Sequence, residues 1–234
     1  MNVAFKAFCE TKKKRPDHYN KVQLKDCVSV ITILLGPNGT GKSMSLRLLE
    51  EECKKKKIKY LKYSNEQEDI VKKAGWDWDP YKLACAFHSE GERIHDSFFE
   101  WCNSVLLKEL LTNTEDIYVM IDELDSGLSI DRIYYIAKQW LSILTMEKEK
   151  NPNRVVKFIF TANSYEMIRC FKSDPRVMLF WIPSHEQIII KNYKDFENMY
   201  MEYYKYMYEE EENESNDMPT DERKNGNRDS LRKK

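Results

Sequence analysis

The feature that most constrains this chain is the octapeptide GPNGTGKS, from Gly36 to Ser43, which has the form G-x-x-x-x-G-K-[ST]. It follows an apolar, β-branched run from Val28 to Leu35. It precedes a segment from Met44 to Cys53 whose apolar residues have helical spacing. A buried strand, a glycine-rich turn and a helix, in this order, are the setting that a phosphate-binding loop requires. We therefore expect an α/β protein organised around this loop.

Each residue type in the loop suits a nucleoside triphosphate. The glycines let backbone N–H groups curl around a phosphate, and the helix N-terminus adds the positive end of its dipole. Lys42 can reach the β- and γ-phosphates, and Ser43 can ligate Mg²⁺. The predicted nucleotide-binding residues are Gly36, Pro37, Asn38, Gly39, Thr40, Gly41, Lys42, Ser43 and Met44.

Composition narrows the class of protein. The chain has 234 residues, 41% apolar and 33% charged, which suits one globular α/β domain with its own core. A net charge of -1 gives no global field that recruits nucleic acid or an acidic membrane, although a local basic loop at 12–15 leaves DNA or RNA contact open. No apolar run approaches the roughly 18 residues of a membrane span, and the six cysteines form no C-x-x-C pair. We expect a cytoplasmic protein that does not insert into membranes.

Strand-like and helix-like segments alternate along the rest of the chain. This pattern predicts a mostly parallel sheet covered by helices. One domain is expected over 1–208, with a small helical subdomain at about 65–113 and a disordered charged tail over 209–234. Strands are predicted at 28–35, 58–63, 117–121, 155–161 and 177–182, a hairpin edge at 188–190, and helices at 44–53, 94–106, 133–144, 165–171 and 196–207.

A second motif follows the short apolar strand from Ile117 to Ile121. This strand would lift Asp122 and Glu123 to the carboxyl end of the sheet, where open α/β sheets bind ligands. Asp122 would hold Mg²⁺ through its water shell, and Glu123 would polarise or deprotonate an attacking water. A buried strand that merely ends in a solvated acidic turn is the simpler interpretation, but the phosphate-binding loop upstream favours the catalytic one.

At these two motifs the chain resembles the ATP-binding-cassette type of ATPase, in a stand-alone soluble form that also shares features with AAA and chromosome-maintenance ATPases. The loop looks like that family's P-loop down to its Pro-Asn-Gly, and Asp122-Glu123 fits its acidic pair with a catalytic glutamate. The resemblance extends over about 22–165. It implies a P-loop fold, ATP and Mg²⁺ as cofactors, and hydrolysis in which Glu123, Lys42 and Asn163 take part.

Weaker matches fall in the family's order. Ser89-Glu90-Gly91-Glu92 resembles a degenerate signature motif, which implies that Ser89, Gly91 and Glu92 contact the ATP of a second subunit. The same residues also fit a capping box between Ser89 and Glu92 ahead of a helix, and the two interpretations are compatible. The segment 124–129 resembles the loop after the acidic pair, with Ser129 in place of aspartate.

Two further residues extend the expected site. Asn163, in Thr161-Ala162-Asn163, stands where the family has a switch histidine. An amide can donate a hydrogen bond toward a γ-phosphate but carries no charge, so slow turnover is expected. Gln67 is a candidate for the family's Mg²⁺-coupling glutamine, or else an ordinary polar loop residue. The expected metal ligands are therefore Ser43, Asp122 and Gln67.

The resemblance implies an ATPase that forms a homodimer around two ATP molecules and regulates or drives a protein partner or a nucleic acid. Three alternatives stay open on the residues. They are the nucleotide-binding subunit of a membrane transporter, a P-loop kinase for a nucleotide or small molecule, and an ATP-gated interaction protein with negligible turnover.

Overall fold

The structure is a computed structural model that describes residues 22–64, 90–123, 125 and 128–217. The chain divides into two compact units, residues 1–189 and 190–234. The described part of the first unit holds the sheet and its covering helices, and that of the second holds the helix α10 (Tyr193–Asp217). The division lies before this helix.

Within the described residues the first unit contains a six-stranded sheet with the order β2-β3-β4-β1-β5-β6. The strands from β2 to β5 along this order pair in parallel, and β6 pairs with β5 in antiparallel fashion. The mostly parallel α/β sheet predicted from the sequence is therefore confirmed. The strand bounds are β1 (Ile31–Leu35), β2 (Lys59–Ser64), β3 (Ile117–Asp122), β4 (Val156–Ala162), β5 (Val177–Trp181) and β6 (Glu186–Ile188).

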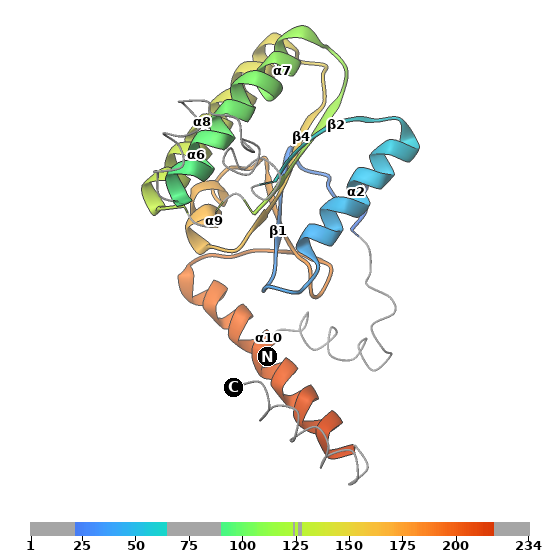
Figure 1. Cartoon of the computed structure of the whole chain (residues 1–234), viewed down its shortest axis with the longest axis vertical. Coiled ribbons are helices and arrows are strands. Elements are labelled where there is room, and N and C mark those ends of the chain that lie inside the picture. Colours follow the sequence, from blue (N-terminus) through green and yellow to red (C-terminus); the bar gives the residue numbers. More distant parts are fainter. Residues whose placement is uncertain (1–21, 65–89, 124, 126–127, 218–234) are drawn as a thin grey trace, which may run out of the picture. The chain divides into compact units, whose positions relative to one another are not determined.

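Helices cover both faces of this sheet (Figure 1). The helix α2 lies on one face, and α6, α7, α8 and α9 lie on the other. The helices α6 and α7 are joined without interruption by a π-helical turn, η1, so that one helical rod runs from residue 90 to residue 112. The bounds are α2 (Lys42–Lys56), α6 (Glu90–Trp101), η1 (Cys102–Leu107), α7 (Lys108–Thr112), α8 (Ile130–Lys150) and α9 (Tyr165–Phe171).

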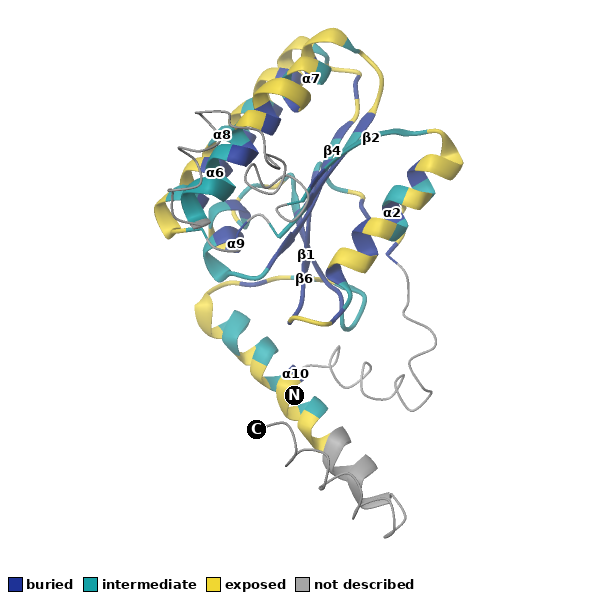
Figure 2. Cartoon of the chain, viewed as in Figure 1, coloured by how far each residue is buried: buried dark blue, intermediate teal, exposed yellow. Residues whose placement is uncertain are grey.

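Alternation along β4 divides the core into two layers. Ile159 packs on the α2 side of the sheet in a buried cluster that includes Leu46 and Leu49 of α2. Phe158 and Phe160 point to the opposite side, where the Trp140 ring of α8 lies with its centroid 5.6 Å and 5.2 Å from theirs. Figure 2 shows the strands buried and the outer faces of the helices exposed. Burial of a large apolar side chain such as Phe158 or Phe160 contributes about 1.5–3 kcal/mol of transfer free energy to folding.

The first predicted strand began too early. Only 31–35 pairs with β4 and β5, and the Val28 side chain is 68% exposed. A turn precedes the strand, in which the Cys27 N–H donates to the Leu24 carbonyl at 3.2 Å. The apolar run is therefore longer than the part of it that the sheet buries.

The last helix continues beyond the predicted start of a disordered tail. We expected disorder from Glu209 onward, but α10 runs to Asp217. Low apolar content argues against an independent core, yet glutamate is a good helix former, so a helix already begun at Tyr193 propagates through the acidic run. The rest of the predicted tail, 218–234, lies outside the described residues.

Candidate functional site

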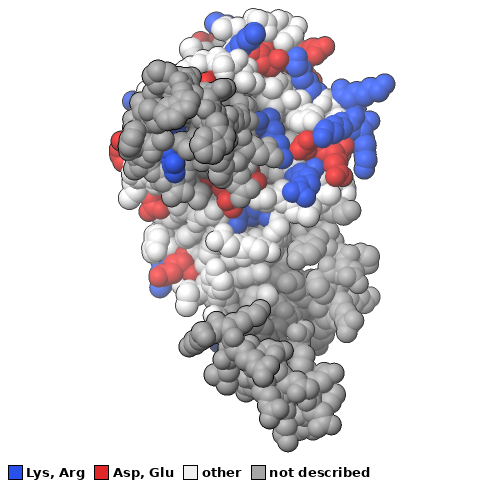
Figure 3. Space-filling model, in the orientation of Figure 1, with Lys and Arg blue, Asp and Glu red and all other residues white. Residues whose placement is uncertain are grey.

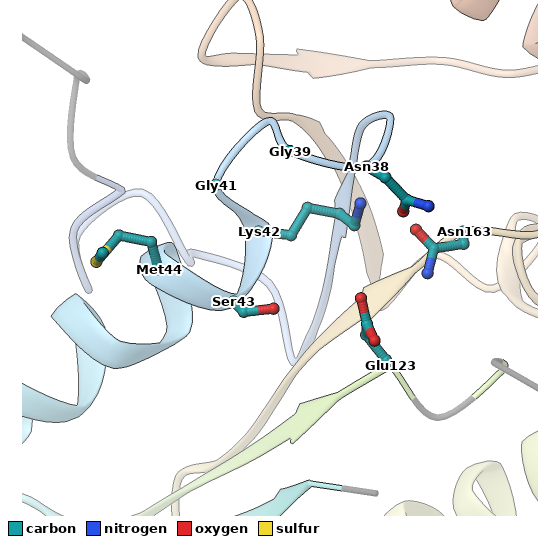
Figure 4. A pocket seen from close by; sticks show the side chains of 8 residues that line it. All are labelled: Asn38, Gly39, Gly41, Lys42, Ser43, Met44, Glu123 and Asn163. Carbon is teal, nitrogen blue, oxygen red and sulfur yellow. The ribbon is translucent and has the colours of Figure 1, made fainter. Parts of the chain in front are cut away.

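The site lies where three adjacent parallel strands end. The phosphate-binding loop follows β1, Asp122 is the last residue of β3 with Glu123 directly after it, and Asn163 follows β4. Because β4 lies between β3 and β1, the carboxyl ends of all three strands meet at one edge of the sheet. There they form a cavity of about 370 Å³ (Figure 4). Its lining residues are Asn38, Gly39, Gly41, Lys42, Ser43, Met44, Glu123 and Asn163.

The loop uses its glycines in two ways. Gly39 and Gly41 have φ angles of 81° and 89°, in the left-handed region that favours glycine, and Gly41 is the N-cap of α2. At Gly36 a side chain would collide with the loop, because a Cβ atom there would lie 2.6 Å from Thr40 Oγ1. The Thr40 hydroxyl itself donates to the Pro37 carbonyl at 2.8 Å. The local fold thus requires the glycines that the motif supplies.

Lys42 reaches back over the loop from the first turn of α2. Its Nζ donates hydrogen bonds to the carbonyl oxygens of Gly36 at 2.7 Å and Pro37 at 3.1 Å. The side chain is buried, and this burial lowers the pKa of the ammonium group, while the carboxylates of Glu123, Asp125 and Asp122 oppose that shift. The ammonium group lines the cavity, where it can attract an anionic ligand.

Ser43 and Asp122 form the candidate metal position. The Ser43 hydroxyl donates to Asp122 Oδ1 at 3.1 Å, although the two residues come from α2 and β3. Hydroxyl and carboxylate oxygens are ligands that Mg²⁺ accepts, and Mg²⁺ usually keeps several waters. Across the described ranges no group of three His, Cys, Asp or Glu residues could hold a metal ion. These two oxygens fit Mg²⁺ that takes its other ligands from water and phosphate; Gln67 lies outside the described residues.

Glu123 occupies an unusual backbone conformation. Its φ angle is 51°, which costs a non-glycine residue on the order of 1–3 kcal/mol unless its surroundings fix it. Its N–H donates to the Thr161 hydroxyl at 2.7 Å. Figure 4 shows its carboxylate pointing into the cavity that Lys42 and Asn163 also line. This carboxylate lies where it can act on a molecule held by the loop.

The loop that carries Asn163 is fixed by Asp125. Asp125 Oδ2 accepts hydrogen bonds from the N–H groups of Asn163 at 2.9 Å and Ser164 at 2.7 Å. Asp125 is 6% exposed. Sequence reasoning placed Asp125 and Thr161 in motifs but gave neither a role. The available signals were a third acidic residue after the pair and a threonine at the end of a mostly apolar strand.

The structure describes the signature-like segment only from residue 90 onward. Gly91 and Glu92 lie in the first turn of α6, and neither is among the described residues that line the cavity. Arg132 of α8 contacts both: Nη1 donates to the Gly91 carbonyl at 3.1 Å, and Nη2 lies 3.6 Å from Glu92 Oε1. Ser89 lies outside the described residues, so the signature and capping interpretations both remain predictions.

The basic run at the end of α2 is paired with acidic residues. Figure 3 shows lysines projecting at this end of the helix with acidic side chains beside them. Lys54 and Lys56 each lie 2.6 Å from a carboxylate, of Glu50 and Glu52 respectively. The run also places positive charge at the negative end of the helix dipole. It is typical of a solvated helix terminus.

Comparisons with known proteins give few matches. No family model matches the chain, and the search of curated proteins finds no match. Among solved structures, the ORC2 protein of Aeropyrum pernix, determined in ADPNP and ADP complexes, matches with a TM-score of 0.27 and 12% sequence identity. The match covers 73% of this chain and 42% of that one, so this chain spans less than half of the ORC2 chain. In the part of the chain that the structure describes, no helix is long and apolar enough to cross a membrane.

Proposed function

We propose that this chain is a P-loop ATPase that binds ATP with Mg²⁺ in the cavity and hydrolyses it. The observation that carries the proposal is that Lys42 and Ser43 of α2 line one cavity with Glu123, which follows β3, while the Ser43 hydroxyl also bonds to Asp122 at the end of β3. Such a constellation offers a phosphate cradle, a cation position and a carboxylate within one site.

The residues have distinct roles in this proposal. Backbone N–H groups of the loop and the N-terminus of α2 hold the phosphates, and Lys42 contacts the β- and γ-phosphates. Ser43 and Asp122 hold Mg²⁺, which when bound neutralises charge on the phosphates. The Asn163 amide donates a hydrogen bond toward the γ-phosphate.

Glu123 acts on the water. Its carboxylate orients a water molecule opposite the leaving β-phosphate oxygen and accepts a proton from it. The water oxygen forms a bond to the γ-phosphorus as the bond from that phosphorus to the bridging oxygen breaks. The products are ADP and inorganic phosphate, and the proton leaves Glu123 to solvent.

The proposal has a finer part, in which two copies enclose two ATP molecules as in ATP-binding-cassette enzymes. Its support is the resemblance of 89–92 to that family's signature motif, together with the finding that Gly91 and Glu92 are not among the described residues that line the cavity of their own chain. The partner that such a dimer would regulate is a protein or a nucleic acid.

Glu123→Gln tests the proposal, with the exposed Glu149→Gln of α8 as a control. Turnover is measured as phosphate release with ATP and Mg²⁺, and size is measured by light scattering after chromatography in ATP. We expect E123Q to bind ATP, to lose at least about 100-fold in turnover, and to accumulate as a dimer, while E149Q behaves as wild type. Unchanged turnover in E123Q would disprove the catalytic assignment, and a monomer in every condition would disprove the dimer. Phosphate transfer that requires an added acceptor would indicate a kinase instead.

A further inference from the structure

The backbone pairing between β3 and β4 ends before β3 itself ends. Backbone pairing of these strands runs to Ile121 opposite Phe160. The next strand, β1, continues to pair with β4 through Thr161 and Ala162. Glu123 therefore lies just beyond the ladder, and its N–H donates to the Thr161 side chain at 2.7 Å. A side-chain hydroxyl thus extends the pairing of β3 with β4 past the last backbone pair.

The Thr161 hydroxyl also contacts Asp122, the other residue of the acidic pair. Thr161 Oγ1 donates to Asp122 Oδ1 at 2.9 Å, and Ser43 Oγ donates to that oxygen at 3.1 Å. Thr161 is fully buried, and a β-branched side chain in a strand has few rotamers to choose from. One rigid hydroxyl therefore fixes the Asp122 carboxylate and the Glu123 backbone together.

We propose that Thr161 is a positioning residue for hydrolysis, which holds Glu123 in its left-handed conformation so that the carboxylate faces the cavity. This inference rests on the proposed ATPase function. The φ angle of 51° at Glu123 is unfavourable for a glutamate, and the 2.7 Å bond from its N–H to Thr161 is a contact that opposes its relaxation. Without the hydroxyl, the N–H of Glu123 loses this acceptor, and the left-handed conformation loses that restraint. Nucleotide affinity comes from the loop and Lys42, so it does not depend on this bond.

Thr161→Val tests the inference because valine is β-branched like threonine but lacks the hydroxyl that makes both hydrogen bonds. We expect kcat to fall by about 10-fold to 100-fold, as for other groups that orient a reacting residue. We expect the Kd of a fluorescent ADP analogue, measured by titration, to stay within about twofold of wild type. The substitution should not change the contacts that hold the nucleotide equally in the ground state and the transition state. Thr161→Ser keeps the hydroxyl and should restore most of the rate. Thr161→Ala also removes the hydroxyl, but unlike valine it does not put a methyl group next to the Asp122 carboxylate. T161A replaces T161V if T161V does not fold.

Two controls separate positioning from general stability. Thr32→Val makes the same change at another buried threonine of the sheet, on β1, and should leave both kcat and Kd unchanged. Combining T161V with E123Q tests whether Thr161 acts through Glu123, since the residual rate of E123Q should then fall no further.

Three results would overturn the inference: wild-type kcat in T161V and T161A, a loss of rate that follows loss of ADP affinity, or an equal loss in the E123Q background. These differ from failure of the proposed function, in which the unmodified chain itself shows no turnover that E123Q removes.

Discussion

Asp125 Oδ2 lies 2.9 Å from the backbone nitrogen of Asn163 and accepts its hydrogen bond, although the two residues follow different strands. Asp125 comes after β3 and Asn163 comes after β4. The bond therefore fixes the loop carrying the candidate γ-phosphate contact to the loop carrying Glu123. The position of one loop is coupled to that of the other.

Asp125→Ala should slow turnover more than it weakens nucleotide binding. It leaves the N–H groups of Asn163 and Ser164 without their acceptor, at a cost of about 1–3 kcal/mol each if they stay buried. Asp125→Asn keeps one oxygen that can accept both bonds, so it should retain most of the activity. Steady-state phosphate release and ADP titration measure the two effects.

Asp116→Ala is the matched control for that experiment. The Asp116 carboxylate also accepts a backbone N–H, from Val155 at 2.8 Å, but at the opposite ends of β3 and β4. It should change stability slightly and leave kcat unchanged. Equal effects of D116A and D125A on kcat would show that Asp125 has no special relation to the site.

Lys42→Ala should abolish nucleotide binding without unfolding the chain. The substitution removes the ammonium group at the cavity, and it also removes the cost of burying that group. We expect the Kd for ATP to rise by at least about 100-fold, as for loss of a charge-assisted contact worth roughly 3 kcal/mol. Isothermal titration measures this, and the exposed Lys55→Ala on the same helix is the control. ATP binding by K42A at wild-type affinity would contradict the assignment of the phosphate site.

Glu147→Ala should destabilise the fold and leave the site intact. The Arg154 guanidinium is buried, with Nη1 3.0 Å from Glu147 Oε1 and Nε bonded to the Glu115 carbonyl at 2.7 Å. Removing Glu147 leaves a buried charge without its counter-ion, which costs about 3–5 kcal/mol. Urea denaturation measures the loss, and ADP titration under native conditions should give an unchanged Kd. The double variant E147L/R154M should be more stable than E147A, and a less stable double variant would contradict this account.

Asp174→Asn should reduce the sensitivity of the fold to acid. Hydrogen bonds from the Arg176 side chain, at 2.9 Å and 2.7 Å, hold the pKa of the Asp174 carboxyl below its usual 3.8. Because the folded-state pKa is depressed, this carboxylate stabilises the fold above pH of about 4 and loses that contribution as pH falls through the folded-state value. D174N should be less stable by about 1 kcal/mol at pH 7 and should lose less stability between pH of about 5 and 2. Urea midpoints at several pH values measure both, and parallel pH curves for D174N and wild type would contradict the prediction.

The centre of the sheet could be predicted from the sequence because its parallel strands are short, mostly apolar runs. Burial on both faces requires such runs in parallel strands, and those at 117–121 and 177–182 became β3 and β5. The start of β1 could not be predicted, because the apolar character of a residue such as Val28 does not indicate whether a partner strand lies beside it. The end of α10 was also misjudged, because low hydrophobicity limits packing and not helix formation.

Candidate site residues could be named from the sequence where chemistry depends on residue type, but not where it depends on position in the fold. The loop and the acidic pair have a pattern that phosphate binding requires, so Lys42 and Glu123 could be named in advance. Thr161 and Asp125 contribute through hydrogen bonds to residues 38 or 39 positions away, as between Thr161 and Glu123 or Asp125 and Ser164. Only the register of β3 against β4 brings these pairs together, and no local pattern encodes it.

The contacts of Lys42 with the carbonyl oxygens of Gly36 and Pro37 have a thermodynamic consequence for any incoming phosphate. The Lys42 ammonium group already donates to two carbonyl oxygens of the loop. When a phosphate binds, its oxygens replace these acceptors. The measured affinity is then a difference between two sets of hydrogen bonds around one ammonium group. Under the proposed function, the carbonyl oxygens of Gly36 and Pro37 would hold the loop together between turnovers and would compete with the departing product for the Lys42 ammonium group.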